Sequence, residues 1–307
     1  NSSAASDVYK RQIYVGSNAT LAATPNLDTN SGGNVNSISA PLTINGDDNG
    51  SEGPGDVVNV DETGDLAVND GTLTTNRIWG LGMPESTESD NGITYETVET
   101  LNLSLGKGLN TFNVQSTSPT ATTTLNTLSA TRSVTGVVYD LGSRLATITT
   151  ATAHNLTSGQ LVGIRNVLGA VGVNGDFIVN SVVSNTSFMI ALFNPPGAFT
   201  SVGVLGTVEG GSVINVGSAT PRDKVDEIRG TLNLVGSGTD TLNVDDTGST
   251  VHKDGTLTAN TLTGLAMGDE GIQYSGVRKL NISLGTGRDH FYIDSTPDGT
   301  TTVLNTG

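Results

Sequence analysis

Two glycine turns in this sequence carry an aspartate at a spacing that suits calcium. GSGTDTLNV (236–244) and GTGRDHFYI (285–293) both follow the pattern G-x-G-x-D-x-U-x, in which U is a large apolar residue. The glycines allow a tight bend, and the carboxylate meets the ion. The alternative is a plain glycine turn in which the aspartate accepts turn N–H groups. The candidate calcium ligands are Asp240, Asp245, Asp246 and Asp289.

The other residues that could do chemistry do not form a catalytic set. His154, His252 and His290 lack the close spacing of a metal-ligand pair, so we expect each to be a solvated side chain. Asp245 and Asp246 could be read as paired carboxylates for polysaccharide cleavage. Neighbours on a strand point to opposite faces, however, so the two would not converge on one bond. The sequence therefore predicts no enzyme and, calcium aside, no cofactor.

These turns belong to a sequence that occurs twice. YETVETLNLSLGKGLNTFNVQST (95–117) returns as YSGVRKLNISLGTGRDHFYIDST (274–296), and the segment 58–83 returns as 242–267. A short insertion, PESTESDNGITY against GDEGIQY, separates the two matched blocks in the first copy. Repetition on this scale is typical of an array or solenoid, in which each unit buries its apolar face against the next.

The first copy keeps the glycine turns but changes the candidate ligands. In GKGLNTFNV, Lys107 brings a positive charge and Asn110 replaces the aspartate. The corresponding acidic cluster of the first copy is Asp56, Asp61 and Glu62. Calcium in the second copy and plain turns in both copies are therefore both compatible with the sequence.

Short alternating segments between the turns predict β-strands. Leu280 and Ile282 fall on one face and Asn281 on the other, the period of two of a half-buried strand. Gly, Thr, Asn, Ser and Val dominate the composition, which disfavours helix and suits pleated surfaces with tight turns. The predicted fold class is all-β, with parallel β-helix or β-solenoid-like tandem repeats. A string of antiparallel sandwiches is the competing architecture.

One segment without a counterpart interrupts the repeat. Its expected strands ATITT, QLVGIRNV, GDFIVNSVV and SFMIALF predict an inserted small β-barrel or meander domain. The expected core of that domain is Ile148, Leu161, Ile164, Phe177, Val179, Phe188 and Ile190. The phrase INVGS after it matches IYVGS near the start of the chain, which places the insert between two repeats. The predicted organisation is 1–12 an assembly artefact or disordered, 13–134 the first repeat, 135–208 the insert, and 209–307 the second repeat.

Composition limits the partners. The net charge of −16 and pI near 4.3 make an anionic surface that repels nucleic acid phosphates and anionic lipid. The absence of cysteine excludes a disulfide scaffold and thiol chemistry. No stretch approaches the roughly 18 to 20 apolar residues of a membrane span.

Several phrases resemble known extracellular proteins. The glycine–aspartate turns resemble the hemolysin-type, or RTX-like, repeats of secreted bacterial proteins, although here they are isolated rather than in tandem. TLNVDDTG and LNISLGTGRDHF resemble the tandem units of giant bacterial extracellular repeat proteins, over 40–127 and 213–307. The insert is similar to small β-barrel modules of phage tail and exoprotein sequences. NSSAASDVYKRQ (1–12) resembles translated adaptor sequence, so a fragment of a longer reading frame is expected.

These observations predict a structural component of an extracellular or cell-surface fibre, sheath, biofilm matrix or adhesive stalk. Its main partner would be other copies of itself, joined end to end, with TTTVLNTG (300–307) abutting a strand like IYVGS. The alternatives are a calcium-stabilised adhesin, a phage-like stalk that binds glycans or a receptor, and a polysaccharide lyase or hydrolase on a β-helix.

Overall fold

The predicted all-β class is confirmed. The computed structural model describes residues 11–16, 32–46, 55–84, 91–199, 206–217 and 223–307. Within those ranges the regular structure is β-strand, apart from one turn of 3-10 helix, η1, at Val171–Val173. Most of the predicted segment 1–12 lies outside the described residues, but Gln12 already begins the first strand.

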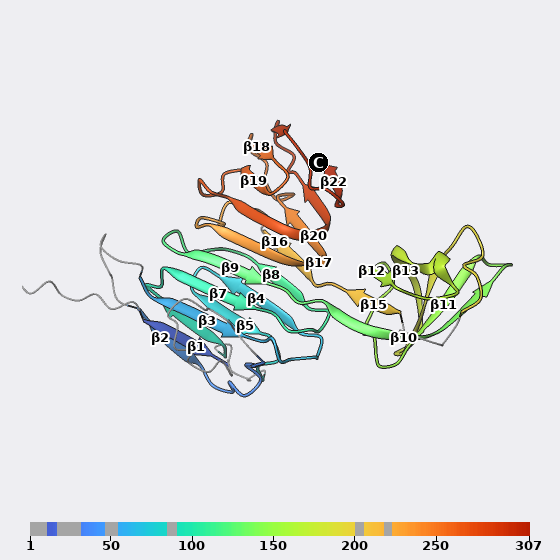
Figure 1. Ribbon diagram of the computed structural model, residues 1–307. Helices are drawn as coiled ribbons and strands as arrows, with labels where there is room; N and C mark the ends of the chain where they lie inside the picture. Colours follow the sequence, from blue (N-terminus) through green and yellow to red (C-terminus); the bar gives the residue numbers. More distant parts are fainter. Residues whose placement is uncertain (1–10, 17–31, 47–54, 85–90, 200–205, 218–222) are drawn as a thin grey trace, which may run out of the picture.

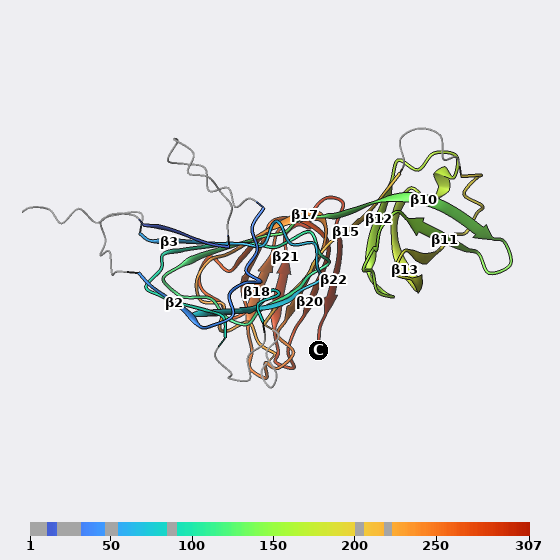
Figure 2. The ribbon, with the colours of Figure 1, turned by 90° about the horizontal axis from the view of Figure 1, so that it is seen from below.

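The first copy forms two layers of strands. Its strands are β1 (Gln12–Val15), β2 (Leu42–Asn45), β3 (Val57–Asp61), β4 (Asp70–Thr74), β5 (Arg77–Gly80), β6 (Ile93–Glu96), β7 (Thr100–Ser104), β8 (Thr111–Val114) and β9 (Thr122–Asn126). In one layer β1, β3, β7 and β9 pair in parallel, in that order. The other layer has the order β2-β6-β5-β4-β8 and contains the antiparallel hairpin β4–β5. Figure 2 shows β3 and β2 in separate layers.

The second copy repeats this arrangement with two long strands. Its strands are β16 (Val213–Val216), β17 (Leu232–Asp245), β18 (Asp254–Leu257), β19 (Thr261–Gly264), β20 (Ile272–Ser283), β21 (His290–Ile293) and β22 (Thr301–Asn305). The first half of β17 corresponds to β2 and its second half to β3. The two halves of β20 correspond to β6 and β7 in the same way. Because β17 and β20 run from one layer into the other, all these strands belong to one curled, 16-stranded sheet.

The layers exchange roles where the copies meet. The all-parallel layer of the first copy ends at β9, which pairs with the first half of β17 in the mixed layer of the second copy. The mixed layer of the first copy ends at β8, which pairs with β16 in the all-parallel layer of the second. Strand pairing therefore continues from copy to copy in both layers (Figure 1), and the copies are not separate closed sandwiches.

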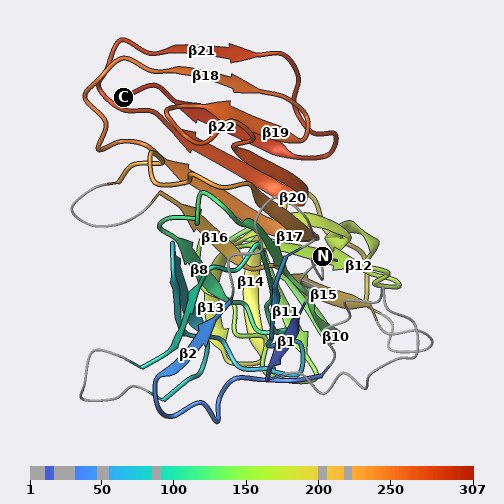
Figure 3. The same ribbon diagram turned by 90° about the vertical axis from the view of Figure 1, so that its left-hand side faces the viewer.

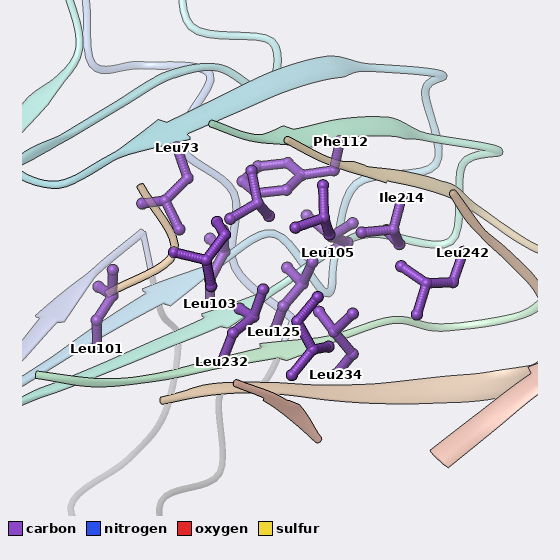
Figure 4. Packing of buried hydrophobic residues seen from close by; sticks show 14 of the residues in the cluster. Leu73, Leu101, Leu103, Leu105, Phe112, Leu125, Ile214, Leu232, Leu234 and Leu242 are labelled. Carbon is purple, nitrogen blue, oxygen red and sulfur yellow. The ribbon is translucent and has the colours of Figure 1, made fainter. Parts of the chain in front are cut away.

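One apolar core runs between the layers through both copies. Leu101, Leu103 and Leu125 face Leu73 and Phe112 across it (Figure 4). Leu232, Leu234, Ile214 and Leu242 extend the same cluster into the second copy. This is the face on which the predicted alternation places the apolar residues. The core is continuous, so each copy covers apolar surface of the other.

The insert is a closed antiparallel barrel. Its strands are β10 (Ala130–Asp140), β11 (Leu145–Thr150), β12 (Leu161–Arg165), β13 (Gly175–Ser184), β14 (Ser187–Ala191) and β15 (Thr207–Gly210), closed in the order β10-β11-β14-β13-β12-β15. Five residues of the expected core, Ile148, Ile164, Val179, Phe188 and Ile190, are buried in a separate cluster. Phe177 packs on that cluster partly buried, and Leu161 lies at the barrel surface with intermediate exposure.

Two adjacent antiparallel strands, β10 and β15, connect the barrel to the two-layer sheet of the copies, which we call the stack. Ala130, at the start of β10, is the register partner of Gly210, at the end of β15. The barrel strands thus span slightly more than the predicted 135–208. Figure 1 shows the barrel beside the stack, and an ion pair between Arg278 and Asp176 joins the two.

Candidate assembly interface

The junction between the copies shows how one unit seats on another. At this junction β16 lies between β8 and the second half of β17, with Ile214 opposite both Phe112 and Leu242. In the other layer, Leu234 lies opposite Leu125. All five side chains are buried. The junction thus combines parallel backbone pairing with apolar burial on the inner face.

A ladder of asparagines crosses the junction on the outer face. Asn215 donates its Nδ2 to Asn113 Oδ1 at 2.9 Å, across the boundary between copies. Asn243 donates to Asn215 at 2.8 Å, and Asn281 donates to Asn243 at 2.7 Å. Stacked side-chain amides of this kind support in-register parallel pairing. The ladder makes the register of the junction specific, because a one-residue slip would turn the amides inward.

Strands equivalent to those of the junction lie at both ends of the stack without a second partner. Among the described residues, β21 pairs with β18 alone and β22 with β20 alone. At the other end, β1 pairs with β3 alone and β2 with β6 alone. Figure 3 shows β21 and β22 at one end of the stack and β1 and β2 toward the other. We call the first pair the tail edge and the second pair the head edge.

Apolar side chains that are buried at the junction are uncovered at the tail edge. Val114 in β8 is fully buried, whereas its counterpart Ile293 in β21 is 53% exposed. Leu125 in β9 is 1% exposed, and its counterpart Leu304 in β22 is only partly buried. The two copies have the same apolar positions here. The difference in burial therefore comes from the strands of the second copy, which cover the first.

The head edge shows the complementary pattern. Ile13 in β1 and Leu42 in β2 are partly exposed, while their counterparts Ile214 and Leu232 are buried at the junction. All four edge strands are short, and each pairs with a single strand of the described part of the chain. Edges of this kind are templates for pairing with another chain.

The predicted calcium ligands act as hydrogen-bond acceptors that close turns, in equivalent ways in both copies. Asp240 accepts the Ser212 N–H at 2.6 Å, just as Asp56 accepts the Arg11 N–H at 3.0 Å. Asp240 also accepts hydrogen bonds from the Thr127 and Ser237 hydroxyls, at 2.7 and 2.8 Å. Burial raises the pKa of Asp240, against these hydrogen bonds that lower it.

The other three candidate ligands follow the same rule. Asp245 accepts the N–H and hydroxyl of Thr247, as Asp61 does from Thr63. Asp246 accepts the Val225 N–H, in the position where Glu62 accepts the Val35 N–H. Asp289 accepts the Lys253 N–H at 2.8 Å, and Asn110 accepts the Asn69 N–H at 3.0 Å. The four aspartates do not gather around one point, and calcium at any of them stays a prediction.

Glu62 and Asp246 occupy equivalent buried positions, but only Asp246 has a lysine beside it. Burial, reinforced by the nearby Asp65 and Asp61, raises the pKa of Glu62 to about 8. Asp246 instead forms an ion pair with Lys253, at 2.8 Å, and Asp226 also contacts that ammonium. Burial alone would lower the pKa of Lys253, but its hydrogen bonds to Asp226 and Asp246 raise it. Asp245 and Asp246 therefore have separate hydrogen-bond and ion-pair partners.

The histidines differ from the prediction. His154 is buried, not solvated: its Nδ1 accepts the Leu156 N–H at 2.9 Å, and its Nε2 lies 3.1 Å from the Ser184 carbonyl oxygen. His252 and His290 are exposed as expected, yet they lie together beside Asp254. The pairing of β18 with β21 brings this cluster together, because it places Asp254 opposite His290. Sequence spacing does not show that pairing.

The chain matches no family model and no curated protein. No helix in the described part of the chain is long and apolar enough to cross a membrane.

Proposed function

We propose that this protein is a structural building block of an extracellular fibre, sheath or matrix, in which the tail edge of one molecule pairs with the head edge of the next. The observation that carries this proposal is the junction inside the chain. There, strands equivalent to the tail edge pair with strands equivalent to the head edge. The extracellular location is proposed from the resemblance to secreted repeat proteins, and the acidic, cysteine-free composition is compatible with it.

The internal junction supplies the register of the proposed contact. β21 of one molecule would pair with β1 of the next, with Tyr292 opposite Tyr14, as Asn113 lies opposite Asn215. β22 would pair with β2, with Val303 opposite Thr43, as Thr124 lies opposite Asn233. This arrangement revises the expected contact between TTTVLNTG and IYVGS, because the layers exchange roles at each junction.

Burial supplies the driving force for this contact. Ile293, Leu304 and Ile13 would become covered in the way that Val114, Leu125 and Ile214 already are. Complete burial of one such side chain stabilises by about 1.5–3 kcal/mol, and these residues are already partly buried. Repeated addition in both layers would give a continuous two-layer rod with a barrel beside each unit. Such a rod is the solenoid-like architecture that the sequence predicts.

Engineered cysteines test the pairing, since the chain has no cysteine of its own. Tyr14→Cys and Tyr292→Cys variants, purified separately and mixed under mild oxidation, should form crosslinked dimers and, as the double variant, crosslinked chains. Thr43→Cys with Val303→Cys should do the same through the other layer. In the proposed contact both pairs would lie in register on neighbouring strands about 4.7–4.9 Å apart, which is within the Cα separation that a disulfide spans.

A crossed pair provides the control. Tyr14→Cys mixed with Val303→Cys should not crosslink, since β1 and β22 would lie in different layers. Negative-stain images and sedimentation should show rods for the natural sequence. Ile293→Lys would place a charge in the junction and should abolish the rods, while Phe193→Lys, at a 90% exposed site on the barrel, should leave them intact. Monomers at high concentration, or crosslinks in the crossed pair alone, would refute the proposed contact.

A further inference from the structure

Three side chains on the outer face near the tail edge converge on one point. His252 precedes β18, Asp254 begins β18, and His290 begins the adjacent β21. The Asp254 Oδ1 atom lies 3.4 Å from His252 Nε2 and 3.3 Å from His290 Nδ1. The imidazole rings are 4.8 Å apart between centroids, at an angle of 80°. Among the residues that the structure describes, this is the one group of three such side chains with ligand atoms this close together.

The hydrogen bonding of His252 leaves two lone pairs facing each other. Its Nδ1 contacts the carbonyl oxygen of Arg288, which can only accept a hydrogen bond, so Nδ1 carries the proton. In the neutral ring, Nε2 then presents a lone pair toward the Asp254 carboxylate. Two acceptors at this distance are held together by a proton or by a metal ion between them. A backbone carbonyl on the far nitrogen is also the support that metal-bound histidines commonly have.

The spacing and chemistry of the three groups select the kind of cation. In a tetrahedral site with metal–ligand bonds of about 2.0–2.1 Å, neighbouring ligand atoms lie about 3.3–3.4 Å apart, which matches both distances to Asp254. All three ligand atoms lie within 4.8 Å of one another, so binding would bring the two imidazole nitrogens to the same separation. Two imidazole nitrogens and one carboxylate suit Zn²⁺ and its neighbours Co²⁺, Ni²⁺ and Cu²⁺. Calcium and magnesium prefer oxygen ligands throughout, so this cluster does not suit them.

We propose that His252, Asp254 and His290 form a site for a divalent transition metal, with zinc as the best match and solvent in the fourth position. The bound ion would join edge strand β21 to β18, its one partner within the described chain. The site is distinct from the predicted calcium positions and does not depend on end-to-end assembly. The first copy has Val68, Asp70 and Thr111 at the equivalent positions, so the proposed site belongs to the second copy alone.

The internal repeat provides variants that suit this fold. His252→Val and His290→Thr install the residues that the first copy carries at the same places. Calorimetric titration of the 307-residue chain with Zn²⁺ should show one tight site, and Co²⁺ should give the visible absorption of a tetrahedral complex. Each histidine substitution, and Asp254→Asn, should weaken Zn²⁺ binding by at least about tenfold. Saturating Zn²⁺ should also raise the melting temperature of the natural chain.

Asp70→Asn is the matched control, because it removes the equivalent carboxylate of the copy that lacks both histidines. It should bind Zn²⁺ like the natural chain. A proton alone, shared between imidazole and carboxylate, is the competing explanation of the geometry. Absence of stoichiometric Zn²⁺ binding, or binding that survives His252→Val and His290→Thr, would overturn the proposed site. Circular dichroism of each variant shows whether the fold is kept.

Discussion

At the scale of single residues, the acidic positions of this chain stabilise turns, and one of them does so at an electrostatic cost. Glu62 is 1% exposed, and one of its carboxyl oxygens accepts the Val35 N–H, while the other is buried near Asp65 and accepts no hydrogen bond from a described residue. In the second copy the equivalent buried carboxylate, Asp246, is neutralised by an ion pair with Lys253. The first copy has Asn69 where the second has Lys253, and within the described part of the chain no buried cation lies beside Glu62.

Glu62 should therefore make stability depend on pH. Its pKa rises from 4.5 in the unfolded chain to about 8 in the native state, so between these values the native state holds a proton that the unfolded chain releases. Stability then falls as pH rises through this window, by at most about 1.4 kcal/mol per pH unit. Urea denaturation at about pH 5 and about pH 9 should show a smaller loss for Glu62→Gln than for the natural chain. Glu227→Gln, at an exposed site, should behave like the natural chain; an equal loss in all three proteins would contradict the assignment.

At the scale of elements, β17 and β20 change layers together at a glycine corner. Gly276 has φ of 62°, and a Cβ atom there would lie 2.1 Å from the carbonyl oxygen of Gly236. A Cβ on Gly236 would likewise lie 2.4 Å from the carbonyl oxygen of Gly276. The pairing register of the two strands shifts at the same place. The corner depends on backbone-to-backbone contact that a side chain would prevent.

Gly276→Ala should destabilise the protein by more than the roughly 1–2 kcal/mol that a left-handed conformation costs an ordinary residue, because a steric clash is added. Gly238→Ala is the matched control: its φ is also positive, at 93°, but its Cβ would meet no atom within 4 Å. Urea denaturation should therefore give a clearly larger loss for Gly276→Ala. Equal losses for the two variants would mean that the close approach at the corner can relax.

Strand positions were predictable from sequence because alternation is local, whereas strand pairing was not. The alternation Leu280–Asn281–Ile282 identified inner and outer faces, and four of the six barrel strands, β11 to β14, were predicted close to their observed bounds. The sequence did not predict β10 and β15, the two strands that connect the barrel to the repeats. The exchange of layers depends on which distant strands pair. The glycines after Leu234 predict a turn between two separate strands, but β17 continues through this segment into the other layer. His252 and His290 meet for the same non-local reason, and the burial of His154 follows from closure of the barrel.

At the scale of the whole molecule, the chain has two hydrophobic cores, one in the stack and one in the barrel. One cluster fills the stack of layers through both copies, and the other fills the barrel. Leu109, from a loop of the stack, belongs to the barrel cluster, and the Arg278–Asp176 ion pair is a second link. Both edges of the proposed assembly lie on the stack. The barrel would then project from the side of each unit without entering the junctions between molecules.

The barrel should therefore be removable without loss of the stack. Because Ala130 and Gly210 are antiparallel partners, residues 131–209 can be replaced by Asn-Gly, the preferred sequence of a two-residue hairpin turn. We expect the shortened chain to keep its β-type circular dichroism and cooperative unfolding, because the stack core stays complete apart from the contacts of Leu109. The Tyr14→Cys and Tyr292→Cys crosslink should persist in it, and rods in negative stain should be thinner and lack lateral density. An unfolded or aggregated product would show that the second copy needs the barrel to dock on the first, while a folded product without rods would place the barrel in the junction.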